Sequence, residues 1–550
     1  MSTTSAPPAM VHRVGLGRRM LPTGILVVGI AILFVTWVWP GNEADSFRVV
    51  KLLTILLATA IGLLLAMRPL SGRRKIISLM VLFVIGVPML FWRPASMNGN
   101  FRPIIVPRSW VRAVLLGGSP DSILEKHRQE QGTAGIEADL TELPDDWPAF
   151  RGPNRDGVVG GPKLARDWAK SPPKEIWRQP AGGGYASFAI ANGFLVTIEQ
   201  RRDDEVVVCY QASTGKEVWT TSWNTRFDES LGGPGPRATP TIAHGDVFAL
   251  GAEGRLVCLN GKDGKEKWRV STLDGNANVE WAQSGSPLVV DDLVIVNVGA
   301  QTEAARGLAV QAFARTTGRP MWAAGNHKTA YVSPQLATLG GMKQVLIFDA
   351  DGLAGHDLAG GAELWRFPWA TKFGINVAQP IVVNDQTVFI CSDYSGNATG
   401  GALVKITEAA GKWSAEQVWR TKNTVIRCKF SSPVRRKQAE GDYAYGLDDP
   451  GKLECIDLKT GKSVWKDDRR PRLGDAFGQG QILLADDLIV VLTEYGELIL
   501  VEATSSAFRE LGRITALTKG PKTWNTPAMA HGRIYVRNEE EMACFDLTGP

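Results

Sequence analysis

The 550-residue sequence predicts an all-β, eight-bladed propeller preceded by a hydrophobic N-terminal region. Three observations predict the propeller. An eleven-residue segment ending in Trp recurs along most of the chain, a tight hairpin signal precedes each Trp marker, and the last copy stops before its Trp. The missing half of that copy lies at the other end of the repeat region, as "KEIW" ending at Trp177, so the two ends are expected to share one blade.

The repeat defines the length of one blade. Five copies have Gly as the seventh residue and Trp as the eleventh: "CYQASTGKEVW", "CLNGKDGKEKW", "AFARTTGRPMW", "GHDLAGGAELW" and "CIDLKTGKSVW". A looser copy with an insertion, "LVKITEAAGKWSAEQVW", ends at Trp419, and a degenerate copy ends at Leu511. Successive markers lie 42 to 54 residues apart, which is the length of a four-stranded propeller blade.

Eight hairpin signals support the same count. Each is an apolar stretch interrupted by a short polar turn, about thirty residues before a Trp marker. They are "AIANGFLV", "TIAHGDVF", "LVVDDLVI", "TLGGMKQVL", "IVVNDQTVF", "AEGDYAY", "LLADDLIV" and "AMAHGRIYV". Asn-Gly, Gly-Gly and Asp-containing pairs between β-rich runs are typical of two-residue hairpin turns.

The Trp at the end of each copy is predicted to dock one blade on the next. In "IDLKTGKSVW", Asp457 can hydrogen-bond its own turn and Gly461 supplies a positive φ, so the chain returns as an outer strand carrying Trp465. A large indole at that position can cover the neighbouring sheet. The predicted docking residues are Trp177, Trp219, Trp268, Trp322, Trp365, Trp419 and Trp465.

These repeats resemble the PQQ-like β-propeller family, which carries a tryptophan-docking motif. The resemblance covers about residues 146–550, and "DDWPAFRGPNRDG" at its start resembles a segment that precedes such propellers in one bacterial subgroup. Two branches of the family imply different functions. Quinoprotein dehydrogenases hold pyrroloquinoline quinone (PQQ) and calcium at the centre, whereas the propeller subunit of the outer-membrane assembly machinery binds proteins without a cofactor.

The first 93 residues predict a membrane anchor. Three apolar runs, at about 24–39, 49–67 and 76–92, approach the length of a membrane-spanning helix. The first run could be a signal peptide, but two more runs follow and no cleavage site is evident, which favours a retained anchor. Basic residues before the first run and between the second and third predict a cytoplasmic N-terminus in the inner membrane and a periplasmic propeller. Residues 94–145 then form a linker, of which 102–118 either lies along the membrane interface or is plain linker.

Composition excludes other classes. The net charge of +5 gives no support to nucleic-acid binding. The six His residues are scattered, and "TGKS" at 460–463 lacks the Gly of a phosphate loop. Four of the six Cys residues occupy one repeat position, which predicts small buried strand residues rather than disulfides. They are Cys209, Cys258, Cys455 and Cys544.

The quinoprotein resemblance implies a site where the innermost strands begin, with oxygen ligands, a carboxylate base, cations and an aromatic floor. Repeat register places nine residues there: Tyr185, Arg237, Gln283, Tyr331, Asn376, Lys429, Asp475, Trp524 and Asn525. Asp475 would be the base and Trp524 the floor, with Lys429 and Arg237 as anion contacts. Against this hypothesis, no adjacent Cys pair and no Cys-x-x-Cys-His motif occurs, and Glu280 is the sole Glu at these positions.

The sequence therefore supports two hypotheses. The first is a membrane-anchored, non-catalytic propeller without a cofactor, which binds a protein or peptide on its funnel face through this polar ring. The alternative is a PQQ- and calcium-dependent dehydrogenase that oxidises alcohols or sugars. Binding of PQQ and turnover of such substrates would separate the two.

Overall fold

The computed structural model describes most of the C-terminal four fifths of the chain. The described ranges are 91–98, 103–107, 118–229, 231–394, 399–448, 451–467, 477–520 and 522–549, together with positions 72, 80, 88 and 111. Two compact units are distinguished, residues 1–96 with 103–116, and residues 97–102 with 117–550. Strands β1 (Trp92–Met97) and β2 (Pro103–Pro107) form a two-stranded sheet.

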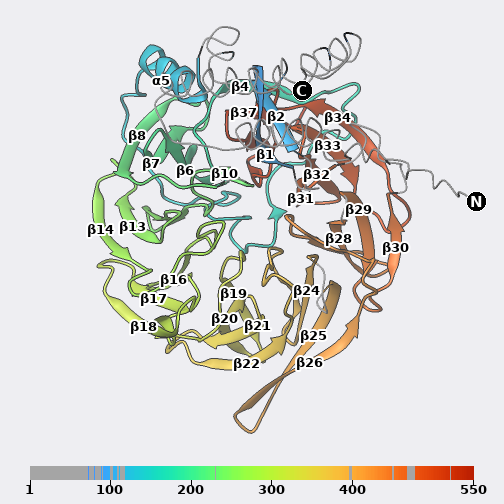
Figure 1. The fold of residues 1–550 in the computed structure, drawn as a ribbon. Helices are drawn as coiled ribbons and strands as arrows, with labels where there is room; N and C mark the ends of the chain where they lie inside the picture. The colour runs from blue at the N-terminus through green and yellow to red at the C-terminus, as the bar shows by residue number, and fades with distance from the viewer. Residues whose placement is uncertain are drawn as a thin grey trace, which may run out of the picture. The chain divides into compact units, whose positions relative to one another are not determined.

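The second unit is a ring of eight antiparallel sheets, as predicted (Figure 1). The first four blades follow one another along the chain. Blade 1 contains β5 (Ala189–Ala191), β6 (Phe194–Arg201), β7 (Asp204–Gln211) and β8 (Glu217–Asn224). Blade 2 contains β11 (Thr241–Ala243), β12 (Asp246–Leu250), β13 (Arg255–Asn260) and β14 (Glu266–Ser271). Blade 3 contains β15 (Leu288–Val290), β16 (Leu293–Asn297), β17 (Val310–Ala314) and β18 (Pro320–Ala324). Blade 4 contains β19 (Gln335–Leu339), β20 (Met342–Phe348), β21 (Gly352–Asp357) and β22 (Glu363–Pro368).

The next three blades include one with a long hairpin and one with an extra strand. Blade 5 contains β23 (Ile381–Asn384), β24 (Thr387–Ser392), β25 (Gly400–Ala409) and β26 (Lys412–Arg420). Blade 6 contains β27 (Val434–Lys437), β28 (Asp442–Asp448), β29 (Lys452–Asp457) and β30 (Ser463–Lys466). Blade 7 contains β31 (Gln481–Ala485), β32 (Leu488–Leu492), β33 (Glu497–Glu502) and β34 (Glu510–Thr515), and β3 (Val158–Val159) pairs in parallel with β31.

Blade 8 closes the ring with strands from both ends of the repeat region, as predicted. It contains β35 (Ala528–Ala530), β36 (Arg533–Arg537), β37 (Glu541–Asp546) and, as its outer strand, β4 (Lys174–Pro180). In the antiparallel pairing of β37 with β4, Cys544 faces Trp177. Outside the blades lie the short hairpin of β9 (Asp228–Glu229) with β10 (Gly233–Pro234) and the 3-10 helix η1 (Glu303–Ala305).

The hydrophobic core is divided into layers between neighbouring blades. One cluster combines Val196 and Val207 of blade 1 with Val247 and Val257 of blade 2, and corresponding clusters fill the later seams. The largest cluster joins blades 7, 8 and 1 around the closing strand. Because each blade buries its faces only against its neighbours, the stability of the propeller depends on these seams.

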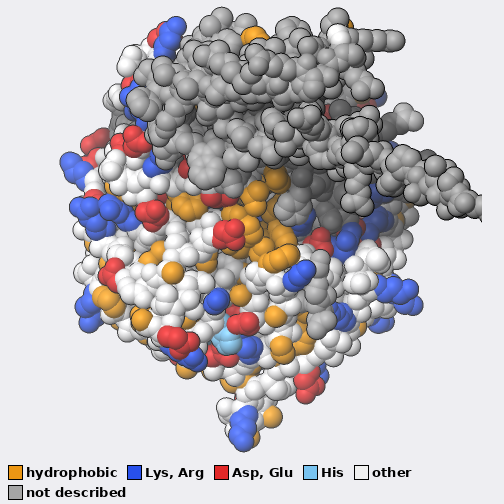
Figure 2. All heavy atoms as spheres, viewed as in Figure 1, with side chains coloured by type: hydrophobic (Ala, Val, Ile, Leu, Met, Phe, Trp, Pro, Cys, Tyr) orange, Lys and Arg blue, Asp and Glu red, His pale blue; other side chains and the backbone are white. Residues whose placement is uncertain are grey.

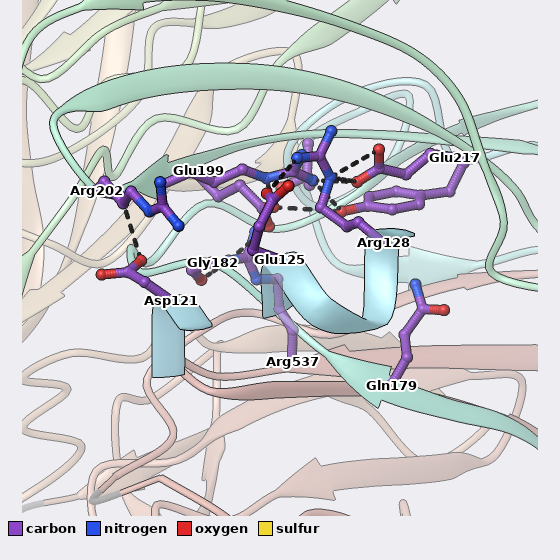
Figure 3. Close-up of polar contacts among 12 residues, drawn as sticks. Asp121, Glu125, Arg128, Gln179, Gly182, Glu199, Arg202, Glu217 and Arg537 are labelled. Carbon is purple, nitrogen blue, oxygen red and sulfur yellow. Dashed lines mark hydrogen bonds and ion pairs between the residues drawn. The ribbon is translucent and has the colours of Figure 1, made fainter. Parts of the chain in front are cut away.

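Helix α5 (Pro120–Gln131), in the predicted linker, packs beside the closing seam (Figure 3). Arg128 Nε donates to Glu217 Oε1 at 2.8 Å, and Asp121 Oδ1 accepts from the Arg202 amide at 3.2 Å. Gln131 Nε2 reaches Gln179 on β4 at 3.1 Å. The helix therefore contacts both blade 1 and the outer strand of blade 8.

A buried ion network lies behind this helix (Figure 3). Arg201 Nε contacts Glu199 Oε1 at 2.8 Å, and its Nη2 contacts Glu217 Oε1 at 2.5 Å. Arg537 of blade 8 approaches Glu199 Oε2 at 3.5 Å. Burial alone would raise the pKa of Glu199, but the attraction of Arg201 and Arg537 holds it below its usual value. The network joins blade 8 to blade 1 through charges that have partners, as buried charges require.

The predicted membrane spans fall almost wholly outside the described residues. The runs 24–39 and 49–67 lie outside them, and of 76–92 only positions 80, 88, 91 and 92 are described. Among the residues that the structure covers, no helix combines the length and the apolar character needed to cross a bilayer.

Candidate functional site

Five of the predicted docking tryptophans share one geometry. Each donates its indole N–H to a carbonyl in the next blade and lies over the Gly of that blade's repeat turn. The donations run from Trp177 to Ala212 (2.9 Å), Trp219 to Gly261 (2.8 Å), Trp268 to Arg315 (2.8 Å), Trp322 to Leu358 (3.2 Å) and Trp419 to Leu458 (3.1 Å). The turn glycines are Gly215, Gly264, Gly318, Gly361 and Gly461, all with positive φ. Trp465 also bonds forward, to Thr504 at 2.8 Å, although no Gly occupies that turn.

Trp365 departs from this geometry. Its indole N–H donates to Gln344 Oε1 of its own blade at 2.7 Å, and the side chain is buried in the core between blades 4 and 5. The reason is the insertion in blade 5, which lengthens the hairpin of β25 and β26 and moves its turn to positions 410 and 411. Trp413 of that hairpin instead packs backwards onto Gly340 of blade 4.

The degenerate copy that ends at Leu511 is completed by a residue from outside the repeats. Trp168 is 4% exposed, lies against Gly512 of blade 7 and belongs to the core shared by blades 7, 8 and 1. The Ala165 amide, three residues earlier, donates to the Leu547 carbonyl in the last turn of blade 8 at 2.8 Å. An indole therefore covers this seam too, although it comes from the segment before the propeller.

A closed circle of hydrogen bonds joins the innermost strands around the axis. The amide of Ser187 donates to Thr239 Oγ1 of the next blade at 2.9 Å, and the pattern repeats through Ser286, Ser333, Gln379 and Ser432. Gln481 bonds Phe430 and Thr526, and Ser187 Oγ donates to the Thr526 carbonyl at 2.6 Å. Innermost strands have one edge without a strand partner, and these side chains satisfy backbone groups on that edge.

The segment "WPAFRGPNRDG" crosses the middle of the ring (Figure 1). Arg151, 1% exposed, donates to the carbonyls of Pro433 at 3.0 Å and Ile482 at 3.2 Å. Arg155, 2% exposed, donates to the carbonyls of Ser286 and Pro334, both at 2.9 Å. Burial lowers the pKa of Arg151 to about 10 and that of Arg155 to about 9. This segment therefore connects blades on opposite sides of the ring through the hydrogen bonds of Arg151 and Arg155.

Stacked aromatic rings and cations gather where the innermost strands of blades 1, 6 and 8 begin. Trp524 stacks on Phe430, with ring centroids 4.8 Å apart. The ring centroid of Tyr185 also lies near Trp524, at 5.4 Å. The Lys522 ammonium lies 3.9 Å from the Trp524 centroid, and Arg237 lies 5.3 Å from that of Tyr185. On the face that Figure 2 presents, hydrophobic side chains gather near the centre of the ring.

Acidic side chains also belong to the cluster around Tyr185 and Trp524. The Tyr185 hydroxyl donates to Glu539, and the Trp524 indole donates to Glu494 Oε1 at 2.9 Å. Burial lowers the pKa of Lys522 to about 8 and raises the pKa of Glu539 above its usual value. The charges of Lys522 and Arg237 thus have aromatic and acidic neighbours within the protein itself.

The described members of the predicted polar ring already bind groups of the protein itself. Asn376 and Asn525 are fully buried, and their Nδ2 atoms donate to backbone carbonyls, at 2.8 Å to Asp349 and 3.0 Å to Ala186. Arg237 is buried against Tyr185 and Phe227, and Lys429, 6% exposed, lies beside Tyr394 and Phe430. The indole faces of Trp524 already contact other side chains of the protein, so the ring is not free to stack on a quinone. Asp475, the predicted base, lies outside the described residues.

One other group has the residue types of a metal site. Within the described part of the chain, ligand atoms of His327, Asp349 and Asp351 lie within 4.8 Å of one another. His327 Nδ1 contacts Asp351 Oδ2 at 2.8 Å, while Asp349 is bonded by Arg366 at 2.9 Å and by backbone amides. Since Arg366 already neutralises Asp349, the group is an ion-pair cluster at the turn between β20 and β21 of blade 4.

The sequence does not single out Lys522, Glu539 and Phe430, which belong to the cluster around Trp524 and Tyr185. They come from loops with no repeat signal. The hydrogen-bonded circle had a signal that could have found it, because Thr-Pro, Ser-Pro or Gln-Pro opens six of the inner strands. Repeat register alone pointed to residues two or three positions earlier, such as Tyr185 and Arg237.

The fold and its seams define a closed propeller of tryptophan-docked repeats. The family described as "Outer membrane protein assembly factor BamB" matches residues 169–305 and 203–467, which together span more than half of the chain. The chain belongs to this family. A relative of the same description from Burkholderia pseudomallei (strain K96243) is 24% identical over 305 residues, covering 54% of this chain and 69% of the relative.

The solved structures to which the chain is similar are more distant in sequence. BamB from Moraxella catarrhalis superposes with a TM-score of 0.47 and 14% identity, covering 68% of this chain and 97% of that one. A europium-containing methanol dehydrogenase superposes with a TM-score of 0.43 and 12% identity, covering 74% and 99%.

Proposed function

We propose that this protein is a protein-interaction platform of the bacterial cell envelope that works without a prosthetic group. Membership of a family described by an assembly factor is the observation that carries the proposal. The cluster around Trp524 supports it, because its aromatic, cationic and acidic side chains already bind one another. Partner binding then uses the outer surface and the loops rather than a central site.

The long hairpin of blade 5 is the contact element that we propose. Its strands β25 and β26 extend beyond the ring (Figure 1). β24 pairs with β25 only up to Lys405, so the part from Thr407 to Ser414 is a two-stranded ribbon with no third strand among the described residues. Val418, at the bulge near its base, is 51% exposed. Exposed strand edges and apolar side chains are what a protein partner uses to extend a sheet.

Site-specific photo-crosslinking in the cells that naturally produce the protein tests this element. A photoreactive amino acid at Glu416 or Val418 is expected to give one adduct of defined mass. Val464 and Met321 are matched controls, because each also stands directly before a docking Trp and is 41% and 46% exposed. Equal labelling from the controls, or no adduct from the hairpin, would contradict the proposal.

A shortened hairpin provides the second arm. Replacing residues 403–419 with the eleven residues 455–465 removes the ribbon and keeps a docking Trp at its end. In this variant the photoreactive amino acid stands outside residues 403–419, and its adduct with the partner is expected to disappear. The circular dichroism spectrum and melting temperature should show that the ring is intact. Binding that survives the replacement would place the contact elsewhere.

The absence of a prosthetic group can be tested directly. The purified full-length chain, titrated with PQQ and calcium, is expected to show no saturable change of PQQ fluorescence and no dye reduction with alcohols or sugars. Stoichiometric PQQ binding would restore the dehydrogenase hypothesis, with Asp475 as its base.

We also propose that residues 1–93 anchor the propeller in the inner membrane, with the N-terminus in the cytoplasm and residues 146–550 in the periplasm. The three apolar runs and the distribution of basic residues support this topology. Protease added to spheroplasts should cleave the propeller and spare an N-terminal tag. Protection of the propeller together with cleavage of the tag would reverse the orientation.

A further inference from the structure

The six cysteines fall into two groups. Four lie on the third strand of a blade, each paired in register with a docking Trp: Cys209 with Trp219, Cys258 with Trp268, Cys455 with Trp465 and Cys544 with Trp177. Cys391 and Cys428 lie outside this position. Cys391 is on β24, and Cys428 is in the connection between β26 and β27. All six are buried.

Cys391 and Cys428 lie together in the seam of blades 5 and 6. Both belong to the hydrophobic cluster that joins these blades, with exposed fractions of 0% and 1%. Cys391 pairs in register with Gly401, where a Cβ would come within 3.2 Å of Ile426 Cγ2, and Ile426 lies two residues before Cys428. Gly446 on β28 faces Cys428, where a Cβ would come within 2.8 Å of Cys428 Sγ. The Glu454 carboxylate holds the Ile426 amide at 2.7 Å and thereby fixes the connection that carries Cys428.

We infer that Cys391 and Cys428 form a disulfide when the chain folds in an oxidising compartment. The inference rests on the envelope location under the proposed function. The oxidant is a disulfide donor, either a protein dithiol catalyst or glutathione disulfide. The thiolate of Cys428 attacks the donor and expels one donor thiolate, and Cys391 then attacks the mixed disulfide and expels the second. Two protons leave the protein, its two thiols are oxidised, and the donor disulfide is reduced to two thiols.

The bond has to form before the seam closes. The neighbouring Cys391 thiol, together with burial, raises the pKa of Cys428, and a protonated buried thiol does not exchange. During folding both residues are still accessible. The four cysteines opposite Trp residues lie on different blades, so they stay reduced and serve as controls within the same molecule.

The disulfide would secure the base of the proposed contact element. It closes the loop from residue 391 to residue 428, which contains the whole of β25 and β26. Cross-links that close a loop restrict the unfolded chain and stabilise the folded one. The link would tie β24 of blade 5 to the connection that leads into blade 6, at the end of β25 opposite its turn.

Differential alkylation of the full-length chain tests the inference. Protein from the cells that produce it is alkylated in denaturant, reduced, and alkylated with a second reagent before peptide mapping by mass spectrometry. Cys391 and Cys428 are expected to carry only the second reagent, and an unreduced sample should contain their cross-linked peptide. The four strand cysteines are expected to carry the first reagent.

A second arm separates the pairing from the compartment. The full-length chain is synthesised in a cell-free reaction with detergent, once with glutathione disulfide and once with reduced glutathione. The cross-link is expected with the disulfide only. If it forms there but not in cells, the pairing stands and the envelope location fails. First-reagent labelling of all six cysteines in both arms overturns the inference.

Stability gives an independent readout. Oxidised wild-type protein is expected to melt about 5 °C higher than the same protein with a reductant. The doubly substituted Cys391→Ala/Cys428→Ala variant should show no such shift, whereas Cys258→Ala should keep it. A shift of equal size in the double variant overturns the inference, because it would come from other groups.

Discussion

The seam between blades 1 and 2 and the seam between blades 4 and 5 are both covered by an indole, but in opposite directions. Trp219 reaches forward from blade 1 and bonds to Gly261 of blade 2. Between blades 4 and 5, Trp365 bonds within its own blade, and Trp413 reaches backward onto Gly340. Both seams nonetheless bury a continuous apolar layer.

The difference shows what the docking motif requires. A forward indole needs a repeat turn at a fixed distance in the next blade, and in five seams the ring lies against the Gly of that turn, whereas Trp465 bonds forward to a turn without Gly. The insertion in blade 5 removes this turn, and the longer hairpin brings its own Trp instead. The condition that the fold imposes is a covered seam, and either blade can supply the cover. Trp168 meets the same condition from outside the repeats.

The forward indole should carry the largest effect. Trp219 is 8% exposed and makes its hydrogen bond in a buried site, so Trp219→Ala should lower the free energy of unfolding by about 3–5 kcal/mol. Urea denaturation followed by Trp fluorescence and circular dichroism measures the loss. A loss below about 1 kcal/mol would mean that the regular seams do not depend on their indoles.

The turn glycine under that indole gives a narrower test. Gly264 has φ +73°, and a Cβ there would meet Trp219 Cε3 at 2.5 Å. Gly193 is a matched control with φ +79° and nothing within 4 Å. Both Gly→Ala variants should lose about 1 kcal/mol from the backbone conformation, and Gly264→Ala about 1–3 kcal/mol more from displacing the ring. Equal midpoints of denaturation for the two variants would contradict the docking contact.

The reversed seam should be less sensitive. Trp413 is only half-buried, so Trp413→Ala should cost about 1–2 kcal/mol, less than the forward Trp219. Hydrogen exchange measured by mass spectrometry should show faster exchange in β25 and β26 and little change in blade 1. Faster exchange in every blade would show that the reversed indole holds the ring as a whole.

The periodic features of this fold could be predicted from the sequence, because each is written several times. The spacing of Gly and Trp gave the blades, and the half copies at Trp177 and Cys544 gave the closing blade. Asp457 and Gly461 form the turn that their residue types predict, with the Lys459 amide donating to Asp457 Oδ1 at 2.6 Å and Gly461 at φ +68°.

Single features without a repeat could not be predicted in the same way. Arg151 and Arg155 are surrounded by carbonyls from blades far away in the sequence, so their roles depend on the closed ring. Asn376 and Asn525 were placed at the inner-strand starts by register, but their amides bond the neighbouring backbone rather than the axis. A side chain's direction there depends on loops that differ from blade to blade.

The smallest effect is expected from the buried cysteines of the regular seams. Their contribution to the free energy of unfolding depends on pH. Burial raises the pKa of Cys258 to about 12, above its value in the unfolded chain. A thiol of this kind contributes stability that is complete below the unfolded pKa near 9 and is lost as the pH rises towards 12, because only the unfolded chain loses the proton. With a reductant present, wild-type protein should therefore lose about 1–2 kcal/mol more than Cys258→Ala between pH 8.5 and 10.5. Urea midpoints measured at both pH values test this difference, and parallel losses in the two proteins would show that the thiol stays accessible to solvent in the seam.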